Sequence, residues 1–200
     1  MQNELIEMFA VPLTVSTYEK SIFQELKFIE NLDFKDNIQG LTRISKDFFI
    51  LNRPELADLK KFIEYQIKLY VKNIYGSNDE VVITQSWVNK AKKGDFHQNH
   101  THSNSLVSGV FYPLLDETLP PIIFKKFTRE ICLNTKEKNK FNSDIYKLNL
   151  SSKSLVLFPS NITHGVPINK SNNLRYSLAF NTWPKGVIGN KDELSYTLEN

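Results

Sequence analysis

The chain has 200 residues, of which 40% are hydrophobic and 24% charged, and its formal net charge is +3. This length fits one globular domain over residues 1–200 with a full hydrophobic core, and it leaves no room for a second catalytic domain. The small net charge and the scattered basic residues do not support a protein that binds nucleic acid electrostatically.

The chain also has few features of secreted or membrane proteins. Its single cysteine, Cys132, excludes an intramolecular disulfide framework. The N-terminus lacks the basic start and long apolar run of a signal peptide, and we find no apolar window long enough to span a bilayer. We therefore expect a cytoplasmic protein without a membrane partner, which could form a homodimer.

Two helix start signals lie in the first part of the chain. Ser16-Thr17-Tyr18-Glu19 has the pattern of a capping box and precedes apolar residues at helical spacing, so we predict a helix from about 16 to 31. Asn52-Arg53-Pro54-Glu55 places proline in a first helical turn, and the apolar face that follows predicts a second helix ending near Tyr75-Gly76. Together they form a helical support over about 16–75.

From Glu80 onward the pattern changes to short β-rich runs bounded by glycine and proline. Such runs are typical of an antiparallel sandwich or barrel. The predicted strands cover 81–88, 106–112, 122–127, 145–150, 155–158 and 174–182. We therefore expect a mainly β fold with N-terminal helices, in which the helices pack on one sheet of a jelly-roll core at about 80–185.

A highly charged segment without periodicity, residues 128–143, interrupts the predicted strands. We interpret it as an insertion between two strands. A plain solvated loop and a lid over the functional site are both compatible with its composition.

Three of the four histidines, His97, His100 and His102, fall within one short stretch, and the fourth is His164. Packing alone does not explain this distribution, which indicates a metal site. If the stretch is extended, residues two apart share a face about 6.6 Å apart, which favours His100 with His102. On an extended strand the His97 side chain would not alternate onto the face shared by His100 and His102, or His97 lies in the preceding loop. If the stretch turns helically instead, His97 could replace His102.

The remote histidine, His164, would supply the third ligand from a turn that leads toward the last strand. Two close ligands and one distant ligand form a facial arrangement, which leaves three coordination positions for a bidentate co-substrate and dioxygen. A purely structural site would be closed. Arg175 and Ser177 follow on one strand face, where a guanidinium and a hydroxyl could bind a buried carboxylate. The alternative for a strand arginine is a surface ion pair.

Several stretches taken together resemble a family of 2-oxoglutarate/Fe(II) oxygenases found in bacteria and phages. The resemblance covers about the last 120 residues, and Phe9-Ala10-Val11-Pro12 is similar to the opening strand of the family. The stretches are Ser86-Trp87-Val88-Asn89, His100-Thr101-His102, Ser108-Gly109-Val110-Phe111-Tyr112, Leu157-Phe158-Pro159-Ser160, His164-Gly165-Val166 and Arg175-Tyr176-Ser177-Leu178-Ala179-Phe180-Asn181.

The resemblance implies a cupin-like double-stranded β-helix, Fe(II) held by His100, His102 and His164, and 2-oxoglutarate anchored by Arg175. The spacing of Asn89 from Gly94 and the first ligand is similar to that in oxygenases with an asparagine near the co-substrate, so Asn89 could donate to 2-oxoglutarate. A buried polar residue at a strand end is the alternative.

The chain departs from the related patterns at a few positions. Ser103 replaces a common proline, Lys153-Ser154 replaces a Gly-Asp turn, and Ala91 stands where a tyrosine often accompanies the asparagine. In the wider superfamily Asp or Glu usually occupies the place of His102, so this site would have one negative charge less.

Other residues near these motifs could belong to the site. Trp87 and Tyr112 could line the pocket or belong to the core. The basic loop with Lys90, Lys92 and Lys93 could contact an anionic substrate or face solvent.

We therefore expect an oxygenase that converts 2-oxoglutarate and O2 to succinate while hydroxylating or demethylating an unidentified primary substrate. The alternatives are a cupin-like zinc or nickel protein that is not an oxygenase, and an inactive binding module. Arg175 distinguishes the first alternative, because such a protein does not need an anion anchor.

Overall fold

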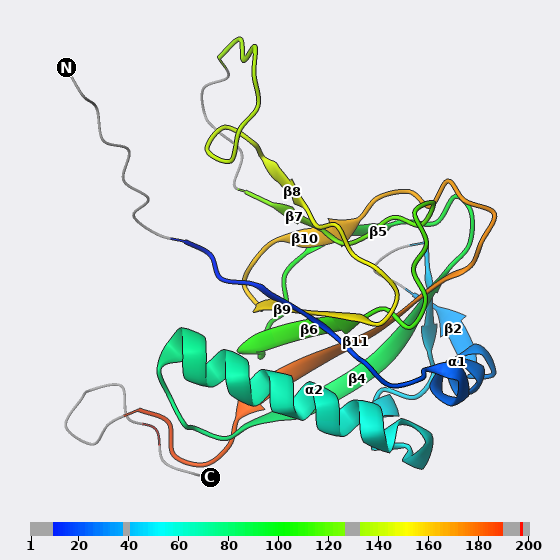
Figure 1. Cartoon of the computed structure of the whole chain (residues 1–200), viewed down its shortest axis with the longest axis vertical. Helices are drawn as coiled ribbons and strands as arrows, with labels where there is room; N and C mark the ends of the chain where they lie inside the picture. Colours follow the sequence, from blue (N-terminus) through cyan, green and yellow to red (C-terminus); the bar gives the residue numbers. More distant parts are fainter. Residues whose placement is uncertain (1–9, 38–40, 127–132, 190–196, 198–200) are drawn as a thin grey trace.

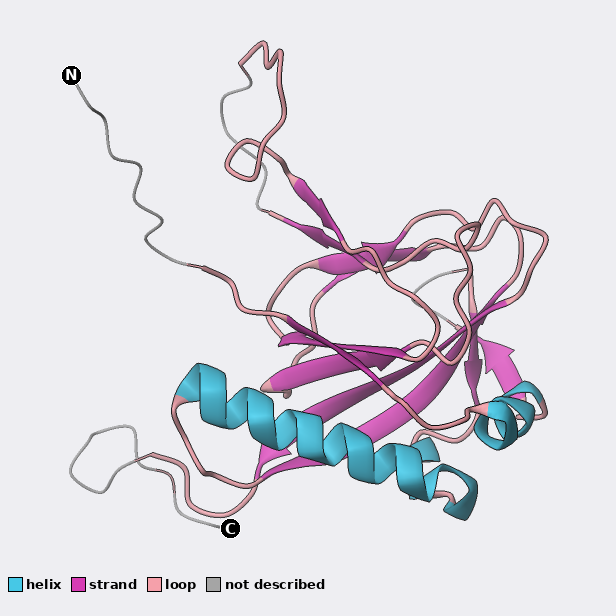
Figure 2. Cartoon of the chain, in the orientation of Figure 1, coloured by secondary structure: helices cyan, strands magenta, loops and turns pink. Residues whose placement is uncertain are grey.

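Two antiparallel β-sheets face each other in the computed structural model, and helix α2 lies along the outer face of the larger sheet (Figure 1). The structure describes residues 10–37, 41–126, 133–189 and 197. Strands and loops dominate these residues, and the helices precede most of the strands (Figure 2). The expected mainly β fold with N-terminal helices is confirmed.

The first predicted helix begins later than its capping box suggests. Thr14–Thr17 forms strand β1, which pairs with β9 (Ser154–Pro159), and helix α1 spans Phe23–Glu30. Ser16 Oγ donates to Gln66 Oε1 at 2.9 Å, so its hydroxyl is used in a tertiary contact and caps no helix. The capping-box prediction was therefore wrong, because sheet pairing satisfies this backbone segment.

The second helix agrees with its start and stop signals. Pro54–Leu56 forms a 3-10 turn, α2 spans Ala57–Tyr70, and a π-helical turn, Val71–Tyr75, completes the helix. Gly76 then adopts φ 65°, a left-handed conformation that glycine tolerates at a helix end. Among the described residues, no helix is long and apolar enough to cross a membrane.

The larger sheet has seven strands in the order β1-β9-β6-β11-β4-β3-β2, and the smaller has four in the order β5-β10-β7-β8. Each of the six predicted strand regions contains a strand, whereas β1, β2, β3, β5 and β10 were missed. The bounds are Phe34–Asp36 (β2), Arg43–Ser45 (β3), Val81–Ala91 (β4), His97–His100 (β5), Val107–Phe111 (β6), Ile123–Lys125 (β7), Ile145–Lys147 (β8), His164–Val166 (β10) and Arg175–Pro184 (β11).

The paired strands β4 and β11 have two different buried faces. Alternate residues such as Val88 and Leu178 belong to the core that also contains the buried face of α2. The opposite face carries the cross-strand pairs Ala91–Arg175, Asn89–Ser177 and Trp87–Ala179, which line a cavity between the sheets. The helices thus support the sheet from outside and leave its inner face for the site.

The charged insertion is described only from residue 133. Residues 133–143 form exposed loops and turns next to strands β7 and β8, and they project from the smaller sheet (Figure 1). Its proposed role as a lid stays a prediction. Cys132 and Phe9 lie outside the described residues, and residues 10–12 of the expected opening strand are not in a strand.

Candidate metal centre and anion pocket

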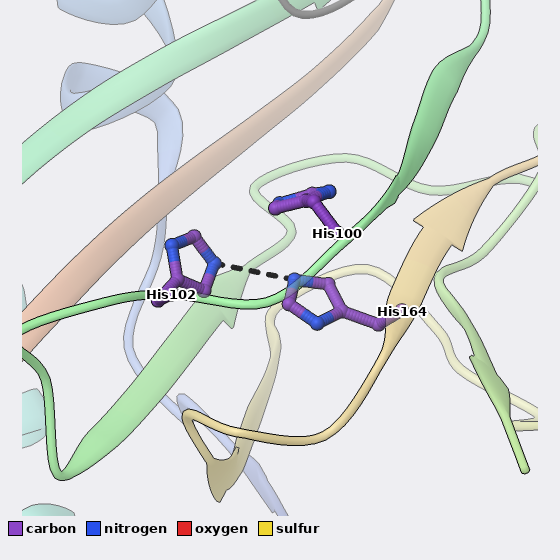
Figure 3. Close-up of side chains that lie close together, drawn as sticks. All are labelled: His100, His102 and His164. Carbon is purple, nitrogen blue, oxygen red and sulfur yellow. Dashed lines mark hydrogen bonds between the residues drawn. The ribbon is translucent and has the colours of Figure 1, made fainter. Parts of the chain in front are cut away.

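Three histidine side chains converge at one end of the cavity, although they come from three different segments. His100 ends β5 and His164 begins β10, and these two residues are cross-strand partners. His102 follows β5 in a loop, where its backbone N–H donates to Ser160 O at 2.9 Å. The ligand atoms of His100, His102 and His164 all lie within 4.8 Å of one another (Figure 3).

The structure brings together the same three histidines that the sequence favours, but alternation along a strand is not the reason. Strand β5 ends at His100, so alternation along a strand does not position His102. The hydrogen bond to Ser160 holds the loop instead. His97 begins β5 and is not part of the cluster of three, but its ring stacks on His100 with centroids 4.5 Å apart.

Backbone carbonyls orient two of the three rings. His100 Nδ1 donates to Gln98 O and His164 Nδ1 donates to Ile162 O, each at 2.8 Å. In a neutral ring this leaves Nε2 with a free lone pair, as metal-binding histidines require. Each of these bonds reaches back only two residues, so local backbone geometry prepares both rings for a metal.

The separation of two ring nitrogens fits an ion between them. His102 Nε2 lies 3.2 Å from His164 Nε2 (Figure 3). Two nitrogen ligands about 2.1 Å from an ion and at right angles would be about 3.0 Å apart. Without an ion, His102 Nε2–H donates to the His164 lone pair, and a cation would replace that proton. The three residues therefore fit a metal ion.

Burial keeps the imidazoles neutral. It lowers the pKa of His102 to about 3 and that of His164 to about 4, and neighbouring histidines add to the shift. Burial likewise lowers the pKa of His97 to about 4. At neutral pH these rings are uncharged and can offer lone pairs.

We expect the metal-free protein to lose stability as the pH falls from about 6.5 toward 4. An unfolded histidine has a pKa near 6.5, whereas the three buried rings resist protonation until about pH 3 to 4. The unfolded chain therefore binds more protons in this window, which lowers the free energy of unfolding. Urea midpoints at about pH 7, 6 and 5 with a chelator test this expectation, and His97→Phe should give a shallower dependence. A constant midpoint would contradict it.

Arg175 lies at another part of the same cavity and is only 2% exposed. Its Nε donates to Pro120 O at 2.8 Å, Nη1 to Ser177 Oγ at 3.1 Å and Nη2 to Tyr112 OH at 3.4 Å. No carboxylate of the described residues forms an ion pair with it. A buried guanidinium without a counterion is costly, so this pocket is suited to an anion.

Tyr112 adds a further donor to this pocket. Its hydroxyl oxygen accepts hydrogen bonds from Arg175 and from the backbone N–H of Ile122 at 3.2 Å, which uses both lone pairs. Burial raises its pKa, so the phenol keeps its proton and can donate it. The sequence alone left open whether Tyr112 lines the pocket or belongs to the core. Its contact with Arg175 depends on pairing between distant strands and was missed.

The other candidate residues divide between the cavity and the outside. Asn89 and Trp87 line the cavity, and the Trp87 ring lies 6.1 Å from the His102 ring. Asn89 is 7% exposed, and its Oδ1 has no hydrogen-bond partner. Lys90 lies over the rings of Phe34 and Tyr176, and neither it nor the two neighbouring loop lysines lines the cavity. The basic loop is therefore not part of the cavity wall.

The cavity contains about 630 Å³ of empty space, including open solvent at its mouth. A histidine triad and a buried arginine line one jelly-roll cavity, which defines a candidate metalloenzyme with a site for an anion.

Comparisons with known proteins identify the class more closely. A family model described as "Putative 2OG-Fe(II) oxygenase" matches residues 85–181. This segment contains all three clustered histidines and Arg175. Nearly half of the chain thus matches this family, which indicates a 2-oxoglutarate- and Fe(II)-dependent oxygenase. Fe(II) and 2-oxoglutarate are the cofactor and co-substrate of the family.

Solved structures confirm the double-stranded β-helix fold. HygX from Streptomyces hygroscopicus with nickel and 2-oxoglutarate bound has a TM-score of 0.63 at 12% identity, over 95% of this chain and 93% of that chain. A Pseudomonas putida prolyl-4-hydroxylase has a TM-score of 0.60 at 12% identity, over 88% and 94% of the respective chains.

A Trichoplax adhaerens prolyl hydroxylase in complex with a hypoxia inducible factor peptide fragment has a TM-score of 0.59 at 11% identity, over 86% of this chain and 83% of that chain. No curated protein matches the sequence. At these identities the structures establish the fold alone.

Proposed function

We propose that the chain oxidises a C–H bond of a primary substrate, as a hydroxylase or demethylase, while 2-oxoglutarate is converted to succinate. The observation that carries this proposal is the combination of an open three-histidine centre and a buried, uncompensated arginine in one cavity. A dicarboxylate with a 2-oxo acid at one end can interact with both groups at once.

The proposed roles follow from the atoms that each residue leaves free. His100, His102 and His164 would hold Fe(II) through ring nitrogens, and three coordination positions would stay open in an octahedral site. Arg175 and Ser177 would bind the distal carboxylate of 2-oxoglutarate with help from Tyr112. Asn89 faces Ser177 across β4 and β11 and would donate its amide N–H to the same ligand.

Iron with 2-oxoglutarate and dioxygen supplies the oxidation, and the overall reaction is 2-oxoglutarate + O2 + R–H → succinate + CO2 + R–OH. The protein positions the ligand and excludes water by burial. Three neutral ligands leave the full dipositive charge on the ion, which favours binding of a dianion. The buried guanidinium adds to this preference.

A cupin-like zinc or nickel protein that is not an oxygenase is less consistent with these features. Such a protein needs the histidines but has no use for an uncompensated arginine in the same cavity. An inactive binding module does not need a cluster of three histidines in which backbone carbonyls orient two of the rings.

The expected result for protein loaded anaerobically with Fe(II) is slow formation of succinate after addition of 2-oxoglutarate and air, even without the primary substrate. Mass spectrometry measures the succinate, with candidate substrates added in parallel reactions. Matched controls are the same protein kept anaerobic and protein loaded with zinc. Absence of succinate from iron-loaded protein in all reactions would favour the cupin-like alternative.

A further inference from the structure

Three buried side-chain atoms of the described residues have no hydrogen-bond partner, namely Tyr18 OH, Asn89 Oδ1 and His97 Nε2. Asn89 and His97 line the cavity, whereas Tyr18 packs in the core beneath α2. Buried polar atoms nearly always have partners in native proteins. An unpaired atom in a ligand cavity therefore marks a position where a ligand supplies the partner. The proposed function uses the amide N–H of Asn89, not its unpaired Oδ1, and it gives no role to His97.

The backbone and the ring of His97 are both held in place. Its position in β5 pairs with Val166 of β10 across an irregular register. Its carbonyl oxygen lies so near Gly165 that a side chain at that glycine would meet it at 3.0 Å. The His97 ring lies nearly parallel to the His100 ring, with an interplanar angle of 28°. Because His100 belongs to the triad, stacking places His97 at the metal end of the cavity.

The surroundings of the ring agree with this position. His97, His100, His164 and Arg175 all line the same cavity, so the ring shares this cavity with both the triad and the anion anchor. A dicarboxylate that extends from the metal to Arg175 would pass beside it. The distal carboxylate already has donors in Arg175, Ser177 and Tyr112, whereas the carboxylate at the metal end has no protein donor assigned.

We propose that His97 Nε2–H donates a hydrogen bond to the metal-side carboxylate of the bound 2-oxo acid, which makes His97 a co-substrate-binding residue. This inference rests on the proposed function. It assigns a role to the one histidine outside the triad, and it gives the unpaired nitrogen a charged acceptor.

The test is His97→Phe, which keeps an aromatic ring against His100 and removes both ring nitrogens. We expect the Fe(II) content to stay unchanged, while anaerobic calorimetry shows 2-oxoglutarate affinity reduced about tenfold or more, as for the loss of a charge-assisted bond. The melting temperature of the metal-free variant should not fall and should rise by a few degrees, because an unsatisfied buried atom is removed. A merely structural histidine would give a lower melting temperature.

Two further variants separate this role from packing. His97→Gln carries an amide N–H of similar reach and should recover part of the lost affinity. Tyr18→Phe is the matched control, because it removes an unpaired buried hydroxyl outside the cavity. The Tyr18→Phe variant should also be at least as stable as wild type, and its 2-oxoglutarate affinity should be unchanged.

A second ligand tests which carboxylate is bound. The acid 2-oxobutanoate lacks the distal carboxylate and keeps the metal-side group, so His97→Phe should weaken its binding by the same factor. Equal 2-oxoglutarate affinity in wild type and His97→Phe would overturn the inference. A loss of affinity for 2-oxoglutarate without a matching loss for 2-oxobutanoate would also overturn it. If iron-loaded wild-type protein binds no 2-oxoglutarate, the proposed function fails and the role of His97 fails with it.

Discussion

Replacement of any one of His100, His102 and His164 by alanine is expected to remove most of the bound iron, whereas His97→Ala should retain it. Each of the three residues supplies one of only three protein ligands. Loss of a residue that merely orients a ligand lowers metal affinity about 10- to 100-fold, so loss of a ligand itself should cost more than about 100-fold. Activity should disappear with the metal.

Metal analysis of the four purified variants measures this effect, and circular dichroism confirms that each variant is folded. His97→Ala is the matched control, because it removes an imidazole in contact with the triad that is not part of the cluster. Retained iron in His102→Ala together with loss in His97→Ala would show that His97 is the third ligand.

A fifth variant, His102→Asp, should still bind iron. It restores the carboxylate that the wider superfamily places at this position, and oxygen ligands suit Fe(II). The shorter side chain must reach the ion from a loop held by the bond from the His102 N–H to Ser160 O, and the substitution does not change that backbone bond. Loss of iron from this variant would indicate that the loop is positioned for an imidazole.

The clustering of His100, His102 and His164 could be predicted from sequence, but the geometry that joins them could not. Clustering of His100 with His102 and the presence of a remote histidine were sufficient signals. The expectation that both neighbours lie on one strand was wrong, because β5 ends at His100 and a hydrogen bond to a distant loop places His102. Contacts between segments far apart in the chain leave no periodic pattern in either segment.

The same limit applies to the fold. The longer strands and helix α2 follow their hydrophobic patterns, whereas the missed strands β2, β3, β5 and β10 have only three or four residues each. Such segments are too short to show alternation. The equally short strands β7 and β8 were found because each lies within a longer β-rich run. Ser16 was assigned to a helix because its local pattern is that of a capping box, while pairing with β9 and the bond to Gln66 determine its actual structure. Tertiary contacts outweighed the local signal there.

Replacement of Arg175 by alanine is expected to leave the iron bound and to weaken 2-oxoglutarate binding by about 10- to 150-fold, with a larger loss if the contact is fully buried. The guanidinium is 2% exposed and has no carboxylate partner among the described residues. Its substitution therefore removes the charge that the distal carboxylate would neutralise. Arg175→Lys should recover only part of the affinity, because an ammonium cannot donate to Pro120 O and bind a carboxylate bidentately at the same time.

Calorimetric titration of the anaerobic iron-loaded proteins measures this loss, and 2-oxobutanoate shows whether it is specific. This acid lacks the carboxylate that Arg175 would bind, so its affinity should be the same in wild type and Arg175→Ala. A general collapse of the cavity would instead weaken both ligands equally. Tyr112→Phe removes a single neutral donor beside Arg175 and should cost less than Arg175→Ala, because a bond from a neutral phenol is weaker than a bidentate bond from a guanidinium. Equal 2-oxoglutarate affinity in wild type and Arg175→Ala would show that the buried charge serves another ligand.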